Sequence, residues 1–550
     1  MSDRRRVVIV GGVAGGMSAA TRLRRVDENA EIIVLERSGY VSFANCGLPY
    51  HLSGTIEERS ALVLQTPHSL AARFGIDVRI KSEVVEIDRA SKQVTVVDTV
   101  EGREYTLPFD HLVLSPGAGA VLPAQPGGER AIPMRDIEDL DRAMAWLYAK
   151  PTSAVVLGGG FIGIEVTENL IKRGMQVSLV QRGPQLLPML DPELAIIVQQ
   201  RMTSAGVSLH LGQTVAKFGK KTVELLDGTI LAADLVFVAS GVSPETALAS
   251  SAGLELGPNG GILVDEFQRT SDSSIYAVGD VAEKVDAVTG ETKLVSLAGL
   301  ANRHGHAVAN HIAGVDSVPA TPALGTSIVS FDGLAAAALG MNEKTATKLG
   351  KKVRIVQTHP ANHAAYYPGA QTMRLKMLVD PETDFILGAQ GVGGEGVDKR
   401  MDVIATAMFA GITASQLAQL ELSYDPQHGS AKDPINMLGY VNRNIAEGLT
   451  RVAEWHEVSE LVSAGTIVVD VRSTGEHKYG HIPGSLNIPV DTLRDHLADL
   501  AGRDVLVYCQ VGQRGHTASR ILSQHGINST NLNGGYLTWK AGMNAKGTQQ

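Results

Sequence analysis

Apolar and polar positions along the start of the chain follow the order strand, turn, helix, strand. An apolar run at 7–10 leads into a glycine-containing turn at 11–16, an amphipathic stretch follows, and a second apolar run occupies 31–36. The same order recurs over 154–181. Short apolar runs joined by helices are typical of parallel strands that are buried on both faces. The pattern therefore predicts an α/β protein with two parallel-sheet units.

The first glycine turn has nearly the spacing of a dinucleotide-binding loop. Glycine there lets the backbone approach a diphosphate at the N-terminus of the following helix. Glu36, at the end of the second strand, is placed to accept a hydrogen bond from a ribose hydroxyl. Val13 departs from the GxGxxG pattern, so the turn alone equally fits a loop that binds no nucleotide. The loop residues expected at the diphosphate are Gly11, Gly12, Val13, Ala14, Gly15 and Gly16.

The second glycine turn carries the full pattern. Gly158, Gly160 and Gly163 stand in GxGxxG register before a strand that ends at Gln181. Because the unit recurs in full register, we expect two nucleotide sites in one chain.

The chain contains two cysteines, Cys46 and Cys509. Two cysteines cannot form a disulfide framework, which indicates a reducing compartment and makes each a candidate reactive thiol. The alternative is that both are buried and serve only as small hydrophobic residues.

Charge and hydropathy exclude several kinds of partner. The formal net charge of -9 lacks the basic excess that phosphate binding by a nucleic-acid partner needs. No apolar stretch approaches the ~18 residues of a membrane span, and no signal peptide precedes the first strand. We therefore expect a cytoplasmic protein without a nucleic-acid or membrane partner. His304, His306 and His311 have no cysteine or carboxylate at ligand spacing, so no metal is expected.

Cys46 stands in the segment SFANCGLPY at 42–50, after a polar loop and before a predicted helix. No second cysteine lies within reach, so this thiol must be oxidised as a mixed disulfide, a persulfide or a sulfenic acid. With the two glycine turns and the apolar runs at 110–118 and 274–282, the segment resembles the coenzyme A disulfide or persulfide reductases. These are single-cysteine members of the flavoprotein pyridine nucleotide-disulfide oxidoreductase family. We expect the helix N-terminus and a flavin to favour the Cys46 thiolate.

The resemblance implies two Rossmann-like domains, the first for FAD and the inserted second for NADH or NADPH, then an α+β dimerisation domain that forms a homodimer. Asp280 would bond the ribityl chain of FAD. The expected boundaries are FAD-binding at 1–149 and 246–322, NAD(P)H-binding at 150–245, dimerisation at 323–446 and a last domain at 447–550. Further expected cofactor contacts are Glu36, Arg37, Asn45, Ala118, Gln181, Arg182, Gly241, Gly279, Asp280 and Ala298.

Coenzyme A is implied as bound substrate or mixed-disulfide partner along a polar lane beside the first helix. Arg22 and Arg25 lie three residues apart on one helical face, where two guanidinium groups would clamp phosphates; a solvated surface pair is the alternative. Arg73 stands in for a lysine of the family pattern. The residues implied to bind substrate are Ser18, Arg22, Arg25, Ser42, Asn45, Arg73, Asn302, Arg303 and, from the partner subunit, Lys432.

The partner subunit is further implied to complete the active site with tyrosines that protonate a leaving sulfur. The matching residues are Tyr366 or Tyr367 and Tyr424. The family pattern near AYAPP reads SYDPQ at 423–427 here, so Tyr424 is kept in a loop whose flanks differ.

The last domain carries the second cysteine in the loop CQVGQRG at 509–515, directly after an apolar strand. Backbone N–H groups around Cys509, with Arg514 facing in, would stabilise an anionic thiol and its persulfide. With VDVRSTGEH at 469–477 and GHIPGSLNIP at 480–489, the loop resembles the α/β rhodanese sulfurtransferases. Cys509 and Arg514 are thus expected to be catalytic; a degenerate, inactive domain is the alternative.

Both resemblances together imply an NAD(P)H-dependent, FAD-containing reductase of coenzyme A disulfide, coenzyme A persulfide or related sulfane-sulfur compounds. Electrons would pass through FAD to a disulfide held by Cys46, and Cys509 would relay sulfane sulfur to Cys46, with hydrogen sulfide as product. Two alternatives remain open. One is an NADH oxidase or peroxidase that uses a Cys46 sulfenic acid, and the other is a persulfide sensor or relay that turns over slowly.

Gln181 bears on the nicotinamide cofactor, because it stands where Glu36 stands in the first unit. A carboxylate would repel the 2′-phosphate of NADPH, whereas glutamine does not and the adjacent Arg182 could pair with it. We expect NADPH to be accepted; the alternative is that Arg182 points to solvent and both cofactors bind alike.

Overall fold

The computed structural model describes residues 4–315 and 318–548. The chain forms two compact units. The first consists of 1–158, 165–179 and 215–325, and the second of 159–164, 180–214 and 326–550. Among the described residues, no helix has both the length and the apolar character needed to cross a membrane.

A five-stranded parallel sheet forms the centre of the first unit. In sheet order its strands are β17 (Ile275–Ala277), β7 (His111–Leu114), β1 (Arg6–Val10), β2 (Glu31–Glu36) and β3 (Asp77–Ile80). The residues of β1, β2 and β7 are almost all buried, as expected for strands covered on both faces. The chain order reverses beside β1, which is the place where open parallel sheets bind ligands. The predicted α/β class is confirmed.

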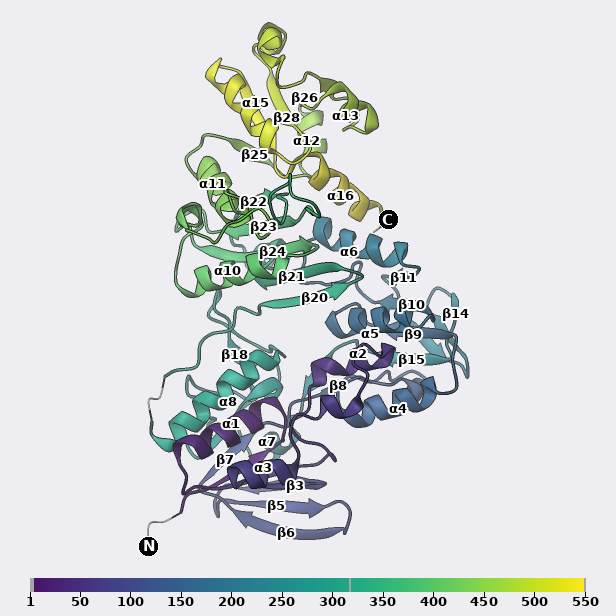
Figure 1. Ribbon diagram of the computed structural model, residues 1–550, viewed down its shortest axis with the longest axis vertical. Coiled ribbons are helices and arrows are strands. Elements are labelled where there is room, and N and C mark those ends of the chain that lie inside the picture. Colours follow the sequence, from purple (N-terminus) through teal and green to yellow (C-terminus); the bar gives the residue numbers. More distant parts are fainter. Residues whose placement is uncertain (1–3, 316–317, 549–550) are drawn as a thin grey trace. The chain divides into compact units, whose positions relative to one another are not determined.

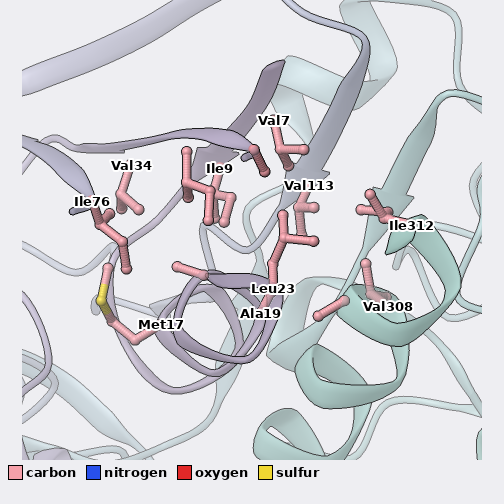
Figure 2. Close-up of a cluster of buried hydrophobic side chains, with 14 of the residues drawn as sticks. Val7, Ile9, Met17, Ala19, Leu23, Val34, Ile76, Val113, Val308 and Ile312 are labelled. Atoms are coloured by element: carbon pink, nitrogen blue, oxygen red, sulfur yellow. The ribbon is translucent and has the colours of Figure 1, made fainter. Parts of the chain in front are cut away.

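Two helices from distant parts of the sequence cover one face of this sheet. They are α1 (Ala14–Val26) and α8 (Ala298–Ala313), which lie side by side in Figure 1. Gly305 of α8 permits the close approach, because a Cβ there would lie 2.3 Å from the carbonyl oxygen of Gly15. Figure 2 shows the buried cluster between sheet and helices, which includes Ile9, Leu23, Val113 and Val308.

Shorter elements complete the first unit. An antiparallel sheet consists of β4 (Ser82–Asp88), β5 (Gln93–Asp98) and β6 (Arg103–Pro108), and a second of β12 (Val215–Phe218), β13 (Thr222–Leu225) and β14 (Ile230–Ala232). β9 (Ser153–Leu157) pairs in parallel with β15 (Leu235–Val238), and β8 (Ala118–Ala120) pairs with β16 (Val242–Pro244). The helices are α2 (Leu48–Ser53), α3 (Pro67–Phe74), α4 (Ile137–Leu147) and α7 (Ala247–Ser251).

A five-stranded antiparallel sheet lies in the second unit. Its order is β20 (Ser327–Phe331), β21 (Leu334–Gly340), β24 (Ile386–Gly393), β23 (Arg374–Val379) and β22 (Arg354–Thr358). The helices α10 (Val397–Phe409) and α11 (Pro434–Ala446) pack against it through one apolar cluster. Strands and helices are segregated here, which confirms the α+β expectation for this region.

The C-terminal part of the second unit is a five-stranded parallel sheet with helices. The strand order is β25 (Arg451–Ala453), β29 (Asn528–Leu532), β28 (Asp504–Tyr508), β26 (Ile467–Asp470) and β27 (Leu486–Asn487). The helices used below are α13 (Thr474–Tyr479), α15 (Gln513–Gln524) and α16 (Gly535–Thr548). α16 lies against α6 (Pro192–Ser204), as Figure 1 shows, with Ile196, Ala541 and Ala545 in one apolar cluster.

A buried ammonium group holds the second unit together. Lys376 of β23 is 1% exposed, and its Nζ lies 2.8 Å from Asp191 Oδ2, 2.5 Å from Glu193 Oε1 and in contact with Glu343. Burial alone would lower the pKa of Lys376, but Glu193, Asp191 and Glu343 raise it well above its usual value. The ammonium therefore occupies the place among the three carboxylates that a metal cation would need.

We expect Lys376→Met to lower the free energy of unfolding by about 3–5 kcal/mol, because it leaves buried carboxylates without their cation. Chemical denaturation followed by circular dichroism measures the change. Lys217→Met is the matched control, since Lys217 pairs with Glu224 at 2.9 Å but is 62% exposed; it should cost less than about 1 kcal/mol. Equal losses in the two variants would contradict the importance of the buried cluster.

Candidate active site

The loop between β1 and α1 is shaped to receive a diphosphate. Gly11 has φ +97°, and a Cβ there would lie 2.1 Å from the carbonyl oxygen of Ser115, so only glycine fits. α1 begins at Ala14, and its N-cap residue Val13 has no side-chain oxygen to offer. The first N–H groups of the helix are therefore free to bind an anion from the loop. The departure from the glycine pattern at Val13 leaves this geometry intact.

Glu36 closes the same loop from the end of β2. Its Oε2 accepts a hydrogen bond from the Gly12 N–H at 2.8 Å, and its Oε1 accepts one from the Ser38 N–H at 2.8 Å. The carboxylate is thus fixed at the strand end, where an adenosine ribose would lie. The residues around the first loop fit FAD.

The second glycine loop repeats this arrangement with a neutral side chain. Gly158 has φ +108°, and a Cβ there would lie 2.3 Å from the carbonyl oxygen of Ala239. Gln181, the last residue of β10 (Gln176–Gln181), accepts a hydrogen bond from the Gly159 N–H at 2.9 Å. The next residue, Arg182, is exposed. Gln181 therefore holds its loop as Glu36 does, without a negative charge.

Cys46 lies in a short 3-10 turn (Asn45–Gly47) that leads directly into α2. Its N–H donates to Oδ1 of Asn45 at 3.0 Å, and the thiol itself is reached by solvent. One turn further on, the Tyr50 hydroxyl donates to Oε1 of Glu165 at 3.2 Å. Glu165 belongs to α5 (Phe161–Lys172), the helix after the second glycine loop. A thiol, a phenol and a carboxyl group are thus neighbours.

Burial raises the pKa of the Cys46 thiol, and the carboxylates of Glu165 and Asp280 raise it further, while Arg135 opposes them. Burial also raises the pKa of Glu165 to about 7 and that of Tyr50 to about 12. These carboxylates act on the thiol pKa in the direction opposite to the effect expected of the helix N-terminus and a flavin.

Arg135 is a site residue that the sequence motifs did not indicate. Its guanidinium donates to the Ala118 carbonyl oxygen at 2.8 Å and to Oδ2 of Asp280 at 3.3 Å. Asp280, expected at the ribityl chain of FAD, is therefore paired with a cation. Tyr50 and Glu165 were also missed, although Glu165 follows Gly163 by only two residues. Of the other expected cofactor contacts, Gly241 and Gly279 have positive φ, Ala298 begins α8 and Arg37 pairs with Glu245.

The polar lane beside α1 is assembled only in part. Oγ of Ser18 donates to Oδ1 of Asn302 at 2.7 Å, and Nε of Arg22 donates to Oδ1 of Asn310 at 2.7 Å, so α1 and α8 share this face. Arg25 instead lies over the ring of Phe74, at 5.1 Å. The two arginines thus have separate partners and form no ready clamp. Arg73 and Arg303 are exposed, and Ser42 has φ +47° with its N–H bonded to the Gly12 carbonyl oxygen.

The tyrosines of the second unit fall into two environments. The hydroxyls of Tyr366 and Tyr424 lie 3.3 Å apart, and this hydrogen bond raises the pKa of Tyr424. Tyr367 packs edge-on against His363, with ring centroids 5.7 Å apart. The structure therefore brings Tyr366, rather than Tyr367, together with Tyr424. Lys432 is exposed beside the start of α11.

Cys509 lies between β28 and α15, fully buried. Its Sγ accepts a hydrogen bond from the Gly512 N–H at 3.2 Å, and Gly512 has φ +95°. α15 begins at Gln513, so the positive end of its dipole also faces the sulfur. A backbone N–H group and the start of a helix thus both face the Cys509 sulfur.

Arg514 interacts with the Cys509 sulfur and also with a carboxylate that the sequence motifs did not indicate. Its NH1 and NH2 donate to Oε2 and Oε1 of Glu476 at 2.8 and 2.6 Å, a bidentate pair. Glu476 is the main cause of the raised pKa of Arg514, and the Cys509 sulfur is a smaller one. The pairing with Arg514 lowers the pKa of Glu476 to about 2. Arg514 is thus shared between the sulfur loop and α13.

The three histidines of α8 lie in different environments. His304 is buried, with a pKa lowered to about 4 by burial, whereas His306 is exposed and His311 stacks on Phe267. Among the described residues, three potential metal ligands, Asp191, Glu193 and Glu343, come close together, and the Lys376 ammonium contacts all three.

Three family models match successive parts of the chain. Residues 5–305 match the pyridine nucleotide-disulphide oxidoreductases, residues 326–433 match the dimerisation domain of the same enzymes, and residues 454–542 match the rhodanese-like domain. These spans agree with the order of domains that the sequence motifs predicted.

Individual relatives agree with the family models. A coenzyme A disulfide reductase of Staphylococcus haemolyticus (strain JCSC1435) is 30% identical over 442 residues, which are 80% of this chain and 100% of that protein. Reduced Bacillus anthracis CoADR-RHD is 42% identical, with a TM-score of 0.97 over 98% of both chains. An NAD-dependent persulfide reductase from A. fulgidus is 34% identical, with a TM-score of 0.90 over 97% of this chain and 100% of that one. The resemblance is confirmed: the chain belongs to the pyridine nucleotide-disulphide oxidoreductase family and carries a C-terminal rhodanese-like domain.

Proposed function

We propose that the protein is an FAD-containing, NAD(P)H-dependent reductase of coenzyme A disulfide, coenzyme A persulfide or related sulfane-sulfur compounds. The observation that carries this proposal is the pair of cysteines in a chain of this family. Cys46 follows the first dinucleotide-binding unit without a second thiol, and Cys509 occupies a rhodanese loop. Relatives named as a coenzyme A disulfide reductase and a persulfide reductase support the substrate class.

The cofactors would be held by the two glycine loops. The first loop with Glu36 would take FAD, and the second with Gln181 and Arg182 would take NADH or NADPH. When bound, FAD supplies two-electron transfer from the nicotinamide to sulfur. Asp280, held by Arg135 at 3.3 Å, would orient the FAD chain.

Cys46 carries the substrate chemistry. Its thiolate attacks coenzyme A disulfide, forming a mixed disulfide and releasing one coenzyme A thiolate. Two electrons then break the new S–S bond, which restores the Cys46 thiolate and releases the second coenzyme A. With coenzyme A persulfide, attack on the outer sulfur leaves a Cys46 persulfide and free coenzyme A. Its two-electron reduction and protonation give hydrogen sulfide.

Residues at the periphery assist these steps. The Tyr366 and Tyr424 pair, contributed by the partner subunit of a homodimer, would protonate the leaving sulfur. Ser18, Asn302 and the exposed arginines of the lane would bind the polar part of coenzyme A. Cys509 would take up sulfane sulfur as a persulfide and deliver it to Cys46. The cytoplasm, where thiols stay reduced, suits both cysteines.

An oxidase or peroxidase is the less favoured function. A water-forming NADH oxidase from Lactobacillus brevis is 24% identical to the chain, which shows a shared fold only. The rhodanese-like domain and the thiol-directed relatives favour sulfur as the electron acceptor.

Replacement of each cysteine separates the two activities. Cys46→Ser should abolish NAD(P)H oxidation with coenzyme A disulfide while the purified protein stays yellow with one FAD per chain. Cys509→Ser is the matched control and should leave that reaction unchanged while abolishing sulfur transfer from thiosulfate to cyanide. Anaerobic spectrophotometry measures both. Reduction of coenzyme A disulfide by Cys46→Ser would refute the proposal.

Glu165→Gln should shift the pH profile of Cys46 alkylation to lower pH. The reason is electrostatic: Glu165, with a pKa of about 7, is partly ionised near neutral pH and its charge disfavours the thiolate. Alkylation by iodoacetamide is followed on the Cys46 peptide by mass spectrometry. The control Glu129→Gln removes an exposed carboxylate and should leave the profile unchanged; an upward shift in Glu165→Gln would contradict the assignment.

Arg182→Ala should weaken the use of NADPH selectively. A hydrogen bond to a charged group is worth ~1.5–3 kcal/mol, which corresponds to roughly 10- to 150-fold in kcat/KM for NADPH relative to NADH. Steady-state kinetics with both cofactors measures the ratio, and Lys220→Ala, which removes another exposed cation, is the control. A strong preference of the unmodified enzyme for NADH, or equal effects on both cofactors, speaks against this role of Arg182.

A further inference from the structure

The segment 533–538, which comprises the two residues after β29 and the first turn of α16, contacts two different parts of the second unit. On one side it meets the Cys509 loop, and on the other it meets β22 of the dimerisation domain. Both sets of contacts involve buried polar groups. The segment therefore links the sulfur loop to a strand outside the rhodanese-like domain.

The contacts with the Cys509 loop are made by the first N–H groups of α16. The Tyr536 N–H donates to the Cys509 carbonyl oxygen at 2.8 Å, and the Leu537 N–H donates to the Gln510 carbonyl oxygen at 3.1 Å. The loop also rests directly on Gly535, where a Cβ would lie 2.5 Å from the Cys509 carbonyl oxygen. A displacement of the segment would consequently move the backbone of Cys509.

The contacts with the dimerisation domain converge on Glu454. Its Oε2 accepts from Nε2 of Gln357 at 2.9 Å, and its Oε1 accepts from Nδ2 of Asn533 at 2.7 Å. The same Asn533 amide donates to the Ile355 carbonyl oxygen of β22 at 3.0 Å. At the other end of the segment, Thr538 Oγ1 and His359 Nε2 lie 2.8 Å apart.

These polar groups are strong constraints because they are buried. Gln357, Glu454 and Asn533 are 5%, 9% and 3% exposed, so a lost partner is not replaced by bulk water. The segment is also held within its own domain, through the Asn533 N–H and the Ala453 carbonyl oxygen at 2.9 Å. Loss of the contacts from β22 would therefore shift the segment without detaching it.

We propose that Gln357 is a positioning residue for Cys509, acting through Glu454 and Asn533 on the segment that carries the loop. Sulfur transfer at Cys509 then depends on a side chain of the dimerisation domain, which touches neither the sulfur nor its substrates. The inference rests on the proposed sulfur-transfer function of Cys509.

The test uses the full-length holoenzyme with Gln357→Leu. We expect kcat for sulfur transfer from thiosulfate to cyanide to fall roughly tenfold with KM unchanged, since a small displacement of a reacting group has effects of this size. The alkylation rate of Cys509 by iodoacetamide, read on its peptide by mass spectrometry, should change in parallel. Reduction of coenzyme A disulfide should stay unchanged. Gln357→Asn, which keeps the amide but withdraws it by one methylene, should give an intermediate loss and serves if the leucine variant does not fold.

Ile196→Ala is the matched control, because it loosens the apolar contact of α6 with Ala541 and Ala545 without touching the segment. It should leave both Cys509 readouts unchanged. Equal losses in the Gln357 variants and in Ile196→Ala would show general loosening and overturn the inference, as would unchanged readouts in the Gln357 variants. If the unmodified enzyme transfers no sulfur, the proposed function of Cys509 fails, and the alkylation rate alone then decides the role of Gln357.

Discussion

Backbone N–H groups before and at the starts of helices, which have no partner within their own helix, organise the reactive sites of this protein. Each of these N–H groups needs a hydrogen-bond acceptor from a neighbouring loop or strand end. The chemical nature of that acceptor determines which ligand can bind at the helix start. The pairs are Gly12 with Glu36, Gly159 with Gln181 and Gly512 with the Cys509 sulfur. The same strand, loop and helix unit thus suits a dinucleotide in two cases and surrounds a cysteine sulfur in the third.

The electrostatics of Cys46 bears on which sulfur leaves its mixed disulfide. The carboxylates of Glu165 and Asp280, together with burial, raise the pKa of Cys46. In thiol–disulfide exchange the sulfur of lower pKa leaves more readily, and a thiolate of higher pKa is the stronger nucleophile. A negative environment around Cys46 therefore favours release of the small thiol, while it lowers the fraction of Cys46 present as the attacking thiolate. The Cys509 loop is different, because there an N–H donor and a helix start face the sulfur.

Local patterns predicted much of this structure, because strand ends, glycine turns and cysteine loops are contiguous in sequence. The Cys46 and Cys509 loops both lie where their flanking strands and helices indicated. Contacts between distant segments were not predictable, as Arg135 and Asp280 show with 145 residues between them. The effect of the Glu165 carboxylate on the Cys46 pKa has the same origin, since the two residues are far apart in sequence. Arg514 was predicted correctly as a residue of the loop, but its bidentate partner Glu476 was not.

Polar contacts with defined directions connect the rhodanese-like domain to β22 of the dimerisation domain. The apolar cluster of Ile196, Ala541 and Ala545 is small, and such contacts tolerate sliding. Hydrogen bonds have directions, and a buried group that loses its partner costs about 1–3 kcal/mol. A rotated arrangement would break the hydrogen bond between Gln357 and Glu454 and the one between Asn533 and the Ile355 carbonyl oxygen at the same time. The observed arrangement of the two domains is favoured because a rotated one would lose these buried hydrogen bonds. The same bonds hold the segment that supports Cys509.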